Sequence, residues 1–426
     1  MISPAVAHVL VASIVGISIV LMLVRPKGIR EVYWIGGGAL LLVLLRLVPL
    51  KLAGKAVAEG SDVYLFLIGM MLLSELARQH GVFDWLSSVA LRGANGSSGR
   101  LFTLVYGIGT LVTIFMSNDA TAVVLTPAIL TVVRKAKAKP LPHLFACALI
   151  ANAASFVLPI SNPANLVVFH KGMPPLGRWL GSFSVPSLLS ITVTYLVMRL
   201  VFRKELQGPI EVKPDPEPLQ GEGKMVLGGI ALVVAALLTA SACNKDLGLP
   251  TCLAALTITA IVSLKAKRNP LELLKEISWG TLALVAGLFV MVDAVESIGA
   301  LSVTQAALQW ARGLPSVAGA LITSFAVGIA NNLVNNLPLG LIAGATLQAA
   351  HVHGLISHAV LIGVDLGPNL SITGSLATIL WLLAIRKEGL DVSFWDFLKV
   401  GAVAMPAALV AAMGGAILME LLLKRM

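Results

Sequence analysis

The sequence predicts an all-α polytopic membrane protein with two inverted five-helix repeats, each containing a re-entrant helical hairpin and an interrupted helix. Three observations predict this fold. Hydrophobic residues make up 57% of the 426 residues and charged residues only 12%, whereas a soluble domain has about 25% charged residues. Apolar runs long enough to cross a bilayer recur along the chain. Finally, motifs of the first half return in the second half.

The predicted membrane spans are ten apolar runs. They cover about 4–24, 32–50, 61–79, 141–159, 181–202, 225–242, 249–264, 279–298, 355–383 and 397–423. Two longer apolar stretches, about 99–134 and 315–350, each have a polar break at the centre, at 117–119 ("SND") and 331–336 ("NNLVNN"). Each arm of about 15 residues would measure about 22 Å as a helix, less than the hydrocarbon thickness of about 30 Å. We therefore expect two re-entrant hairpins.

Between the halves lies a segment that cannot span a membrane. Residues 203–224, "RKELQGPIEVKPDPEPLQGEGK", contain four prolines and nine charged side chains, which is typical of a solvated linker. The predicted organisation is a first transmembrane repeat over 1–202, a cytoplasmic linker over 203–224 and a second, inverted repeat over 225–426.

The repeat is visible in matching residues. Gly69 and Glu75 return 218 positions later as Gly287 and Asp293. With one gap allowed, Asn118-Asp119 falls on Asn335-Asn336. Five spans per repeat is an odd number, so the second repeat must be inverted. Inverted repeats with broken helices in matching positions are typical of secondary transporters.

The basic residues predict an orientation. With the spans threaded alternately, one face collects 22 of the 31 Lys and Arg residues and the other collects 9. Cytoplasmic loops carry the excess of basic residues. The linker is therefore expected in the cytoplasm of a multi-pass inner (plasma) membrane protein, with both termini outside. The net charge of +10 reflects this bias and does not indicate nucleic-acid binding.

The polar breaks are the candidate substrate site. The hairpin tips and the breaks in "LPISNPANLVVF" (158–169) and "LGPNLSITGSLATILW" (366–381) should meet near the membrane midplane. The alternative for each residue is a cap on a helix end. The candidate substrate-binding residues are Ser117, Asn118, Asp119, Ser161, Asn162, Asn165, Asn335, Asn336, Gly374, Ser375 and Thr378.

A carboxylate within a membrane segment is costly and indicates function. Burial disfavours its charged form, as a proton carrier requires. Asp119 is the first candidate for proton coupling, since it is the only acid at either tip. Asp365 is the second candidate. Glu75 and Asp293 follow, with a solvated or capping acid as the alternative for both.

These motifs carry a resemblance. "SNDATAVVLTP", "NNLVNNLP", "SNPAN" and "GPNLSITGSLATILW" resemble the ArsB-type arsenite efflux permeases of the ion transporter superfamily over essentially the whole chain. The resemblance implies export of arsenite and antimonite in exchange for protons. It also implies a cytosolic arsenite-stimulated ATPase as the partner of some members. This chain has no Walker A motif, so ATP use would require that separate subunit.

The residues are compatible with that substrate. Arsenite is neutral As(OH)3 at neutral pH, and amide, hydroxyl and backbone groups suit such a solute. Neither tip has a Lys or Arg, which counts against a dicarboxylate. Cys147, Cys243 and Cys252 are too far apart in the predicted topology for one thiolate site. We expect no cofactor and no resident metal. The alternatives left open are a sodium–proton antiporter and a silicic acid or other metalloid exporter.

Overall fold

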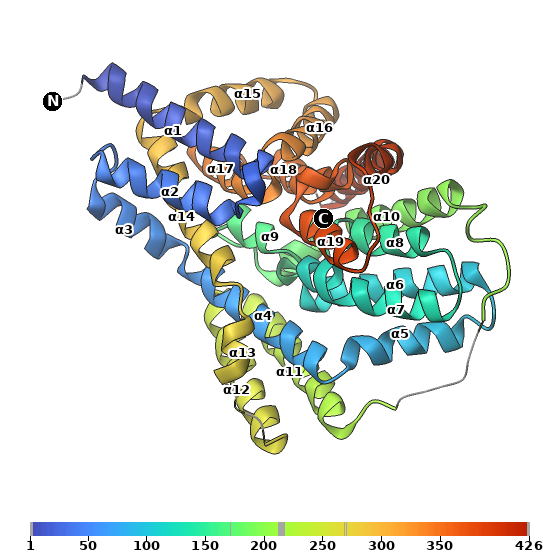
Figure 1. Cartoon of the computed structure of the whole chain (residues 1–426). Coiled ribbons are helices and arrows are strands. Elements are labelled where there is room, and N and C mark those ends of the chain that lie inside the picture. Colours follow the sequence, from blue (N-terminus) through green and yellow to red (C-terminus); the bar gives the residue numbers. More distant parts are fainter. Residues whose placement is uncertain (1–2, 171, 212–217, 268, 270, 424–426) are drawn as a thin grey trace.

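Helices provide the regular secondary structure of the described residues, together with one isolated bridge between Ser97 and Pro209. This computed structural model describes residues 3–170, 172–211, 218–267, 269 and 271–423 (Figure 1). The predicted all-α class is therefore confirmed. Part of the predicted linker, 212–217, and the ends of the chain lie outside the described residues.

The two halves of the chain have the same order of helices. The first half contains α1 (Pro4–Val24), α2 (Glu31–Leu44), α3 (Leu50–Glu59), α4 (Ser61–Gln79), α5 (Val82–Gly93), α6 (Ser98–Met116), α7 (Thr126–Lys135), α8 (Pro140–Ala153), α9 (Pro163–Val168) and α10 (Leu176–Val201). The second half contains α11 (Gly221–Ala242), α12 (Gly248–Lys265), α13 (Leu271–Glu276), α14 (Trp279–Ser297), α15 (Leu301–Gly313), α16 (Ser316–Val334), α17 (Asn336–Ala349), α18 (Leu355–Leu366), α19 (Leu376–Lys387) and α20 (Phe394–Leu423).

The register between the halves corrects one detail of the sequence comparison. Both α4 and α14, and likewise α6 and α16, begin and end 218 positions apart. The residues after α6 and α16, Ser117 and Asn335, both have a positive φ, of 125° and 78°. Asn118 therefore corresponds to Asn336 without a gap. Asp119 then corresponds to Leu337, so the acid has no counterpart in the second hairpin.

The helices of the two halves pack reciprocally. Helix α4 packs on α12, and α14 packs on α2. The matching glycines explain this contact. A Cβ at Gly69 would lie 2.9 Å from the Thr251 carbonyl carbon of α12, and a Cβ at Gly287 would lie 2.9 Å from Ile35 Cγ2 of α2. Small residues permit such close approach of helices in membranes.

We expect Gly69→Ala to destabilise the protein, because the added Cβ meets backbone atoms that cannot move aside. Overpacking of this kind costs roughly 1–3 kcal/mol. Gly107→Ala is the matched control, since no atom lies within 4 Å of its Cβ position on the exposed side of α6. Thermal unfolding in detergent should show a lower midpoint for the first variant only. Equal midpoints would contradict the close packing.

The lengths of the helices modify the predicted spans. Among the described residues, eight helices are long and apolar enough to cross a membrane, or nine when α3 and α4, bent by 46°, count as one span. The first arm of each hairpin, α6 or α16, has 19 residues, about 28 Å, so the predicted 15-residue arms are too short. Helices α2 and α8 have 14 residues each.

Both hairpins reverse the chain direction. In the first, Thr121 Oγ1 lies 2.8 Å from Thr113 Oγ1 and donates to the Gly109 carbonyl at 3.4 Å, which a continuous helix would not allow. In the second, Gln309 of α15 donates to the Ala350 carbonyl at the end of α17. The neighbouring carbonyl of α15, that of Ala311, lies against Gly319 at the start of α16. The two arms of the first hairpin therefore fold back on each other beside the tip, and the start and end of the second hairpin both lie against α15.

The helices form two groups. Helices α1–α4 and α11–α14 pack on one another and form the flanking bundle, whereas α5–α10 and α15–α20 form the hairpin bundle (Figure 1). Within the hairpin bundle, α10 and α20 pack along each other, and α8, α9 and α18 are its most completely buried helices. The linker is less free than predicted: Ile210 N donates to the Gly96 carbonyl and Glu211 N to the Ala136 carbonyl, both at 2.9 Å. These bonds fix its first residues to the base of the first hairpin.

Candidate functional site

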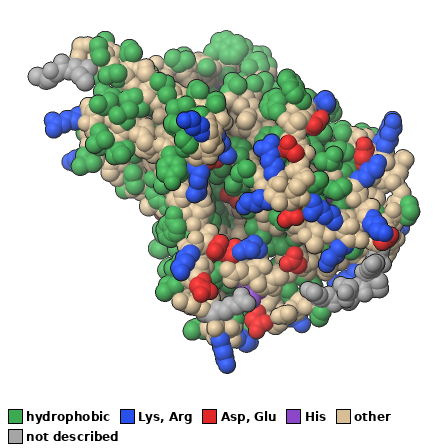
Figure 2. All heavy atoms as spheres, viewed as in Figure 1, with side chains coloured by type: hydrophobic (Ala, Val, Ile, Leu, Met, Phe, Trp, Pro, Cys, Tyr) green, Lys and Arg blue, Asp and Glu red, His purple; other side chains and the backbone are tan. Residues whose placement is uncertain are grey.

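A cavity of about 620 Å³ lies between the two bundles. Its walls come from the α1–α2 loop, α4 and α14 on one side, and from the first hairpin, α9 and α19 on the other. In Figure 2, charged side chains gather around the hollow on this face. At its inner end the cavity reaches Ser117, Asp119 and Pro163. It therefore connects the surface with the first hairpin tip and both interrupted helices.

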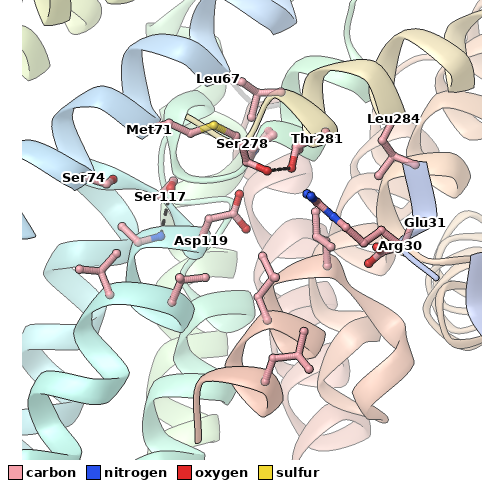
Figure 3. Close-up of a pocket in the computed structure, with 18 of the residues that line it drawn as sticks. Arg30, Glu31, Leu67, Met71, Ser74, Ser117, Asp119, Ser278, Thr281 and Leu284 are labelled. Atoms are coloured by element: carbon pink, nitrogen blue, oxygen red, sulfur yellow. Dashed lines mark hydrogen bonds between the residues drawn. The ribbon is translucent and has the colours of Figure 1, made fainter. Parts of the chain in front are cut away.

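The first hairpin tip presents an unpaired acid. Asp119 is half-buried and lines the cavity, and in Figure 3 its carboxylate points into it. No hydrogen bond or ion pair joins the Asp119 side chain to another described residue. The backbone after the tip forms a π-helical segment over Ala120–Leu125. At its end the Thr126 hydroxyl donates to the Thr121 carbonyl at 3.0 Å.

The charged side chains around the cavity are mostly paired. Arg25 forms an ion pair with Glu31. The Arg386 guanidinium donates to Asp391 at 2.7 Å and lowers the pKa of that exposed carboxyl. In the sequence analysis, these arginines contributed only to the charge bias that predicts the orientation of the protein in the membrane. Their place on a cavity wall depends on how distant loops meet, for which the sequence has no local signal.

Of the remaining candidate acids, Glu75 lines the cavity, but its carboxylate is already bound by neighbouring side chains. It lies 2.5 Å from Arg78 Nη2 and accepts from Gln79 Nε2 at 2.9 Å. Its counterpart Asp293 is half-buried on α14 and also engaged by a neighbouring group. Neither is as open to a solute as Asp119.

The interrupted helices meet in a buried contact between the repeats. Asn162 accepts from Ala164 N at 2.9 Å, which caps α9, and its Nδ2 donates to Asp365 Oδ1 of α18 at 2.5 Å. Both side chains are 1% exposed or less. The structure thus brings Asn162 and Asp365 together, away from the cavity wall. Here Asp365 serves as the acceptor that connects the two broken helices.

A second buried network joins the same helices, and half of it was not predicted. Asn152 Nδ2 donates to Asn369 Oδ1 at 2.9 Å and to Thr378 Oγ1 at 3.4 Å. The hydroxyls of Ser375 and Thr378 lie 2.7 Å apart. Asn152 and Asn369 were missed, although an Asn in an otherwise apolar helix is a usable signal. Gly374 belongs to the same break, because a Cβ there would lie 2.5 Å from Pro368 Cα.

The residue after each tip has an unsatisfied amide. Asn118 and Asn336 are 2% and 3% exposed, and their Oδ1 atoms have no hydrogen-bond partner among the described residues. Buried polar atoms normally find partners, so each of these oxygen atoms is an acceptor still open to a hydroxyl donor, although neither residue lines the cavity. Asn335 instead caps α17 through Leu337 N at 3.4 Å and borders a small adjoining crevice.

Several predicted site residues have structural contacts. Ser117, Asn162, Asn335 and Ser375 each accept from a backbone N–H at a helix start, which is the capping alternative. Ser161 donates to the Ile114 carbonyl, and Asn165 Nδ2 to three backbone carbonyls. In this arrangement Ser117 and Asp119 are the predicted substrate-binding residues that border the cavity. A substrate role for the others stays a prediction.

The fold and the cavity between the bundles define a polytopic membrane transporter. A sequence model described as "Citrate transporter" (CitMHS) matches residues 5–365, so the chain belongs to this family. Among similar proteins, the "Arsenical pump membrane protein" of Escherichia coli (strain K12) is 26% identical over 419 residues, 92% of this chain and 95% of that protein. The "Putative arsenical pump membrane protein" of Bacillus subtilis is 25% identical, with 90% and 93% covered.

A solved structure supports the fold. The YdaH transporter of Alcanivorax borkumensis, described as having an unusual topology, matches with a TM-score of 0.58 at 16% sequence identity. The match covers 89% of each chain. The membrane protein class predicted from the sequence and the resemblance to arsenical permeases are therefore confirmed.

Proposed function

We propose that this protein exports trivalent metalloids, As(OH)3 and Sb(OH)3, from the cytoplasm in exchange for protons. The observation that carries the proposal is the inner end of the cavity, where the one charged group at the hairpin tip is the unpaired carboxylate of Asp119. A carboxylate there repels anions and accepts hydrogen bonds from hydroxyl groups. The relatives named as arsenical pump proteins support this substrate class.

The hydrogen-bonding groups of the tips suit a neutral trihydroxy solute. As(OH)3 has three O–H donors. The Asp119 carboxylate lines the cavity, and the neighbouring Asn118 Oδ1 and, at the second tip, Asn336 Oδ1 are buried acceptors without partners among the described residues. The apolar cavity residues Val123, Val124 and Leu380 would exclude water around such a small ligand. The thiolate alternative gains no support, because Cys147 is buried in α8 and Cys243 is exposed after α11.

Asp119 is the best proton carrier among the four candidate acids. Facing outside, it would take up a proton from the more acidic medium. Facing the cytoplasm, it would release that proton and accept a hydrogen bond from As(OH)3. Glu75 is held by Arg78 and Gln79, Asp293 is engaged, and Asp365 is enclosed with Asn162. Asp119 combines access to the cavity with a free carboxylate.

A second substrate class is favoured by one observation. Arg25, Arg30 and Arg386 line the cavity, and the family is described as citrate transporters, so a carboxylate anion is the alternative. Two of these arginines already pair with acids. The acid at the tip also opposes a multiply charged anion, which makes the neutral metalloid the better fit.

Everted membrane vesicles with an imposed pH gradient would test the substrate. We expect arsenite and antimonite to accumulate in vesicles that contain the protein, and not in vesicles without it. Citrate and sodium should show no gradient-driven uptake. Uptake of silicic acid is measured in the same vesicles as a further comparison. Uptake of citrate or sodium without arsenite would overturn the proposed substrate class. Accumulation without ATP would show that no ATPase subunit is required.

The orientation is part of the proposal, with the linker and the cavity mouth in the cytoplasm. Gln207 is exposed at the start of the linker, and Cys243 is exposed at the opposite end of α11. We expect a membrane-impermeant maleimide to label Cys243 in intact cells. In a variant without Cys243, Gln207→Cys should be labelled only in everted vesicles. The reverse pattern would invert the topology.

A further inference from the structure

Arg30 is the arginine of the cavity wall without an acidic partner among the described residues. The other two are occupied, Arg25 by Glu31 and Arg386 by Asp391. Arg30 is exposed and lines the same cavity as Asp119. The cavity therefore holds one unpaired cation and, at its inner end, one unpaired carboxylate.

The α1–α2 loop fixes the position of Arg30. Arg25, Lys27 and Gly28 have φ values of 48°, 56° and 70°, which bend the chain tightly after α1. Arg30 directly precedes α2. A Cβ built at Gly280 would lie 2.8 Å from Arg30 Nη2, so the guanidinium rests over the first turn of α14. Arg30 thus belongs to the flanking bundle, whereas Asp119 belongs to the hairpin bundle.

The two charges face each other across the cavity. In Figure 3, the Arg30 side chain and the Asp119 carboxylate extend into the space from opposite walls. Ser278 and Thr281, whose hydroxyl oxygens lie 2.8 Å apart, line the same cavity. Opposite charges attract more strongly in a cavity with low-dielectric walls than in open water. The attraction acts only while Asp119 is deprotonated.

We propose that Arg30 is the electrostatic partner of Asp119 and makes movement of the hairpin bundle depend on proton or substrate loading. An empty, deprotonated tip would be held near the flanking bundle. A proton removes the charge of Asp119, and a bound As(OH)3 occupies its oxygen atoms, so either one weakens the attraction. The role in transport rests on the proposed function, whereas the charge pairing does not.

Apart from Glu276, the other charged groups around the cavity are paired with one another. They are the Arg25–Glu31 pair of the α1–α2 loop, the Glu75–Arg78 pair of α4 and the Arg386–Asp391 pair at the end of α19. Glu276 of α13 is exposed at the mouth. The paired groups contribute little net charge, so removal of Arg30 should change the field at Asp119 most directly.

Infrared titration of the purified protein would test the pairing without any substrate. The C=O band of protonated Asp119 is identified as the band that Asp119→Asn removes. In Arg30→Gln its midpoint should rise by about half to one pH unit, because the cation that favours the carboxylate is gone. Arg30→Lys should keep most of the wild-type midpoint. Gly280→Ala, which displaces the guanidinium, should shift it in the same direction as Arg30→Gln.

Lys27→Gln is the matched control, since it removes one positive charge from the same loop outside the cavity lining. An unchanged midpoint in Arg30→Gln, or an equal shift in Lys27→Gln, would overturn the pairing. In vesicles, Arg30→Gln should lower uphill arsenite accumulation severalfold and spare downhill exchange. A midpoint shift without any arsenite transport would leave the pairing intact and refute the proposed function instead.

Discussion

Asp119→Asn is expected to abolish pH-driven accumulation of arsenite, while downhill exchange of arsenite continues. The amide keeps the shape of the side chain and its capacity to accept a hydrogen bond, but it cannot take up a proton at physiological pH. Since Asp119 corresponds to Leu337 in the second repeat, no equivalent acid at the other tip can replace it. The ratio of the arsenite concentration inside the vesicles to that outside should fall to about one, the value that a passive pathway reaches.

Both activities should be measured in the same vesicles, across a series of imposed pH gradients. Glu75→Gln is the comparison, because Glu75 lines the same cavity but is held by Arg78. It should retain uphill transport. If Asp119→Asn still concentrates arsenite under a proton gradient alone, Asp119 is not the proton carrier. Asp365 would then be the next candidate.

Asn162→Ala is expected to destabilise the protein strongly. The substitution removes the cap of α9 and the amide that donates to Asp365 at 2.5 Å. A lost cap costs about 0.5–2 kcal/mol and a lost hydrogen bond about 0.5–1.5 kcal/mol. The midpoint of thermal unfolding in detergent should therefore fall clearly. In Asp365→Asn the loss should be smaller, and in the double variant it should be less than the sum of the two single losses.

Asn118→Ala provides the contrast. Its Oδ1 has no partner among the described residues, so this variant should keep its thermal midpoint and lose arsenite transport. The pair of variants separates residues that hold the fold from residues that bind the solute. If Asn162→Ala unfolds at the wild-type temperature, the contact with Asp365 does not connect the repeats. If Asn118→Ala transports normally, the unsatisfied amide is not part of the substrate site.

The sequence predicted the architecture well because the membrane imposes it locally. Apolar length, polar breaks and the 218-residue repeat identified the spans, the hairpins and the matching pairs Gly69–Gly287 and Glu75–Asp293. The exact register at the tips was not predictable. A sequence comparison favoured the chemically similar Asn118-Asp119 and Asn335-Asn336, whereas the backbone aligns the residues with positive φ, Ser117 and Asn335.

The site was predicted only in part. Polar residues in apolar segments are visible in a sequence, but a capping role and a binding role have the same signature. Asn162 and Ser375 were predicted to bind substrate with capping as the alternative; here both cap helices, and a substrate role for them stays a prediction. Arg30 was hidden for another reason. The role proposed for it depends on a loop that folds beside α14 and shares a cavity with Asp119, an arrangement of segments distant in sequence.

The most direct test of the account is accumulation of arsenite by the purified protein in proteoliposomes, driven by a proton gradient alone. Neither ATP nor sodium is present, and the protein is oriented so that its cytoplasmic face can be loaded. We predict that arsenite accumulates against its own gradient, that a protonophore collapses the accumulation, and that Asp119→Asn prevents it. Arsenite that only equilibrates in the wild-type protein, or accumulates only when sodium or ATP is supplied, would contradict the proposed exchange.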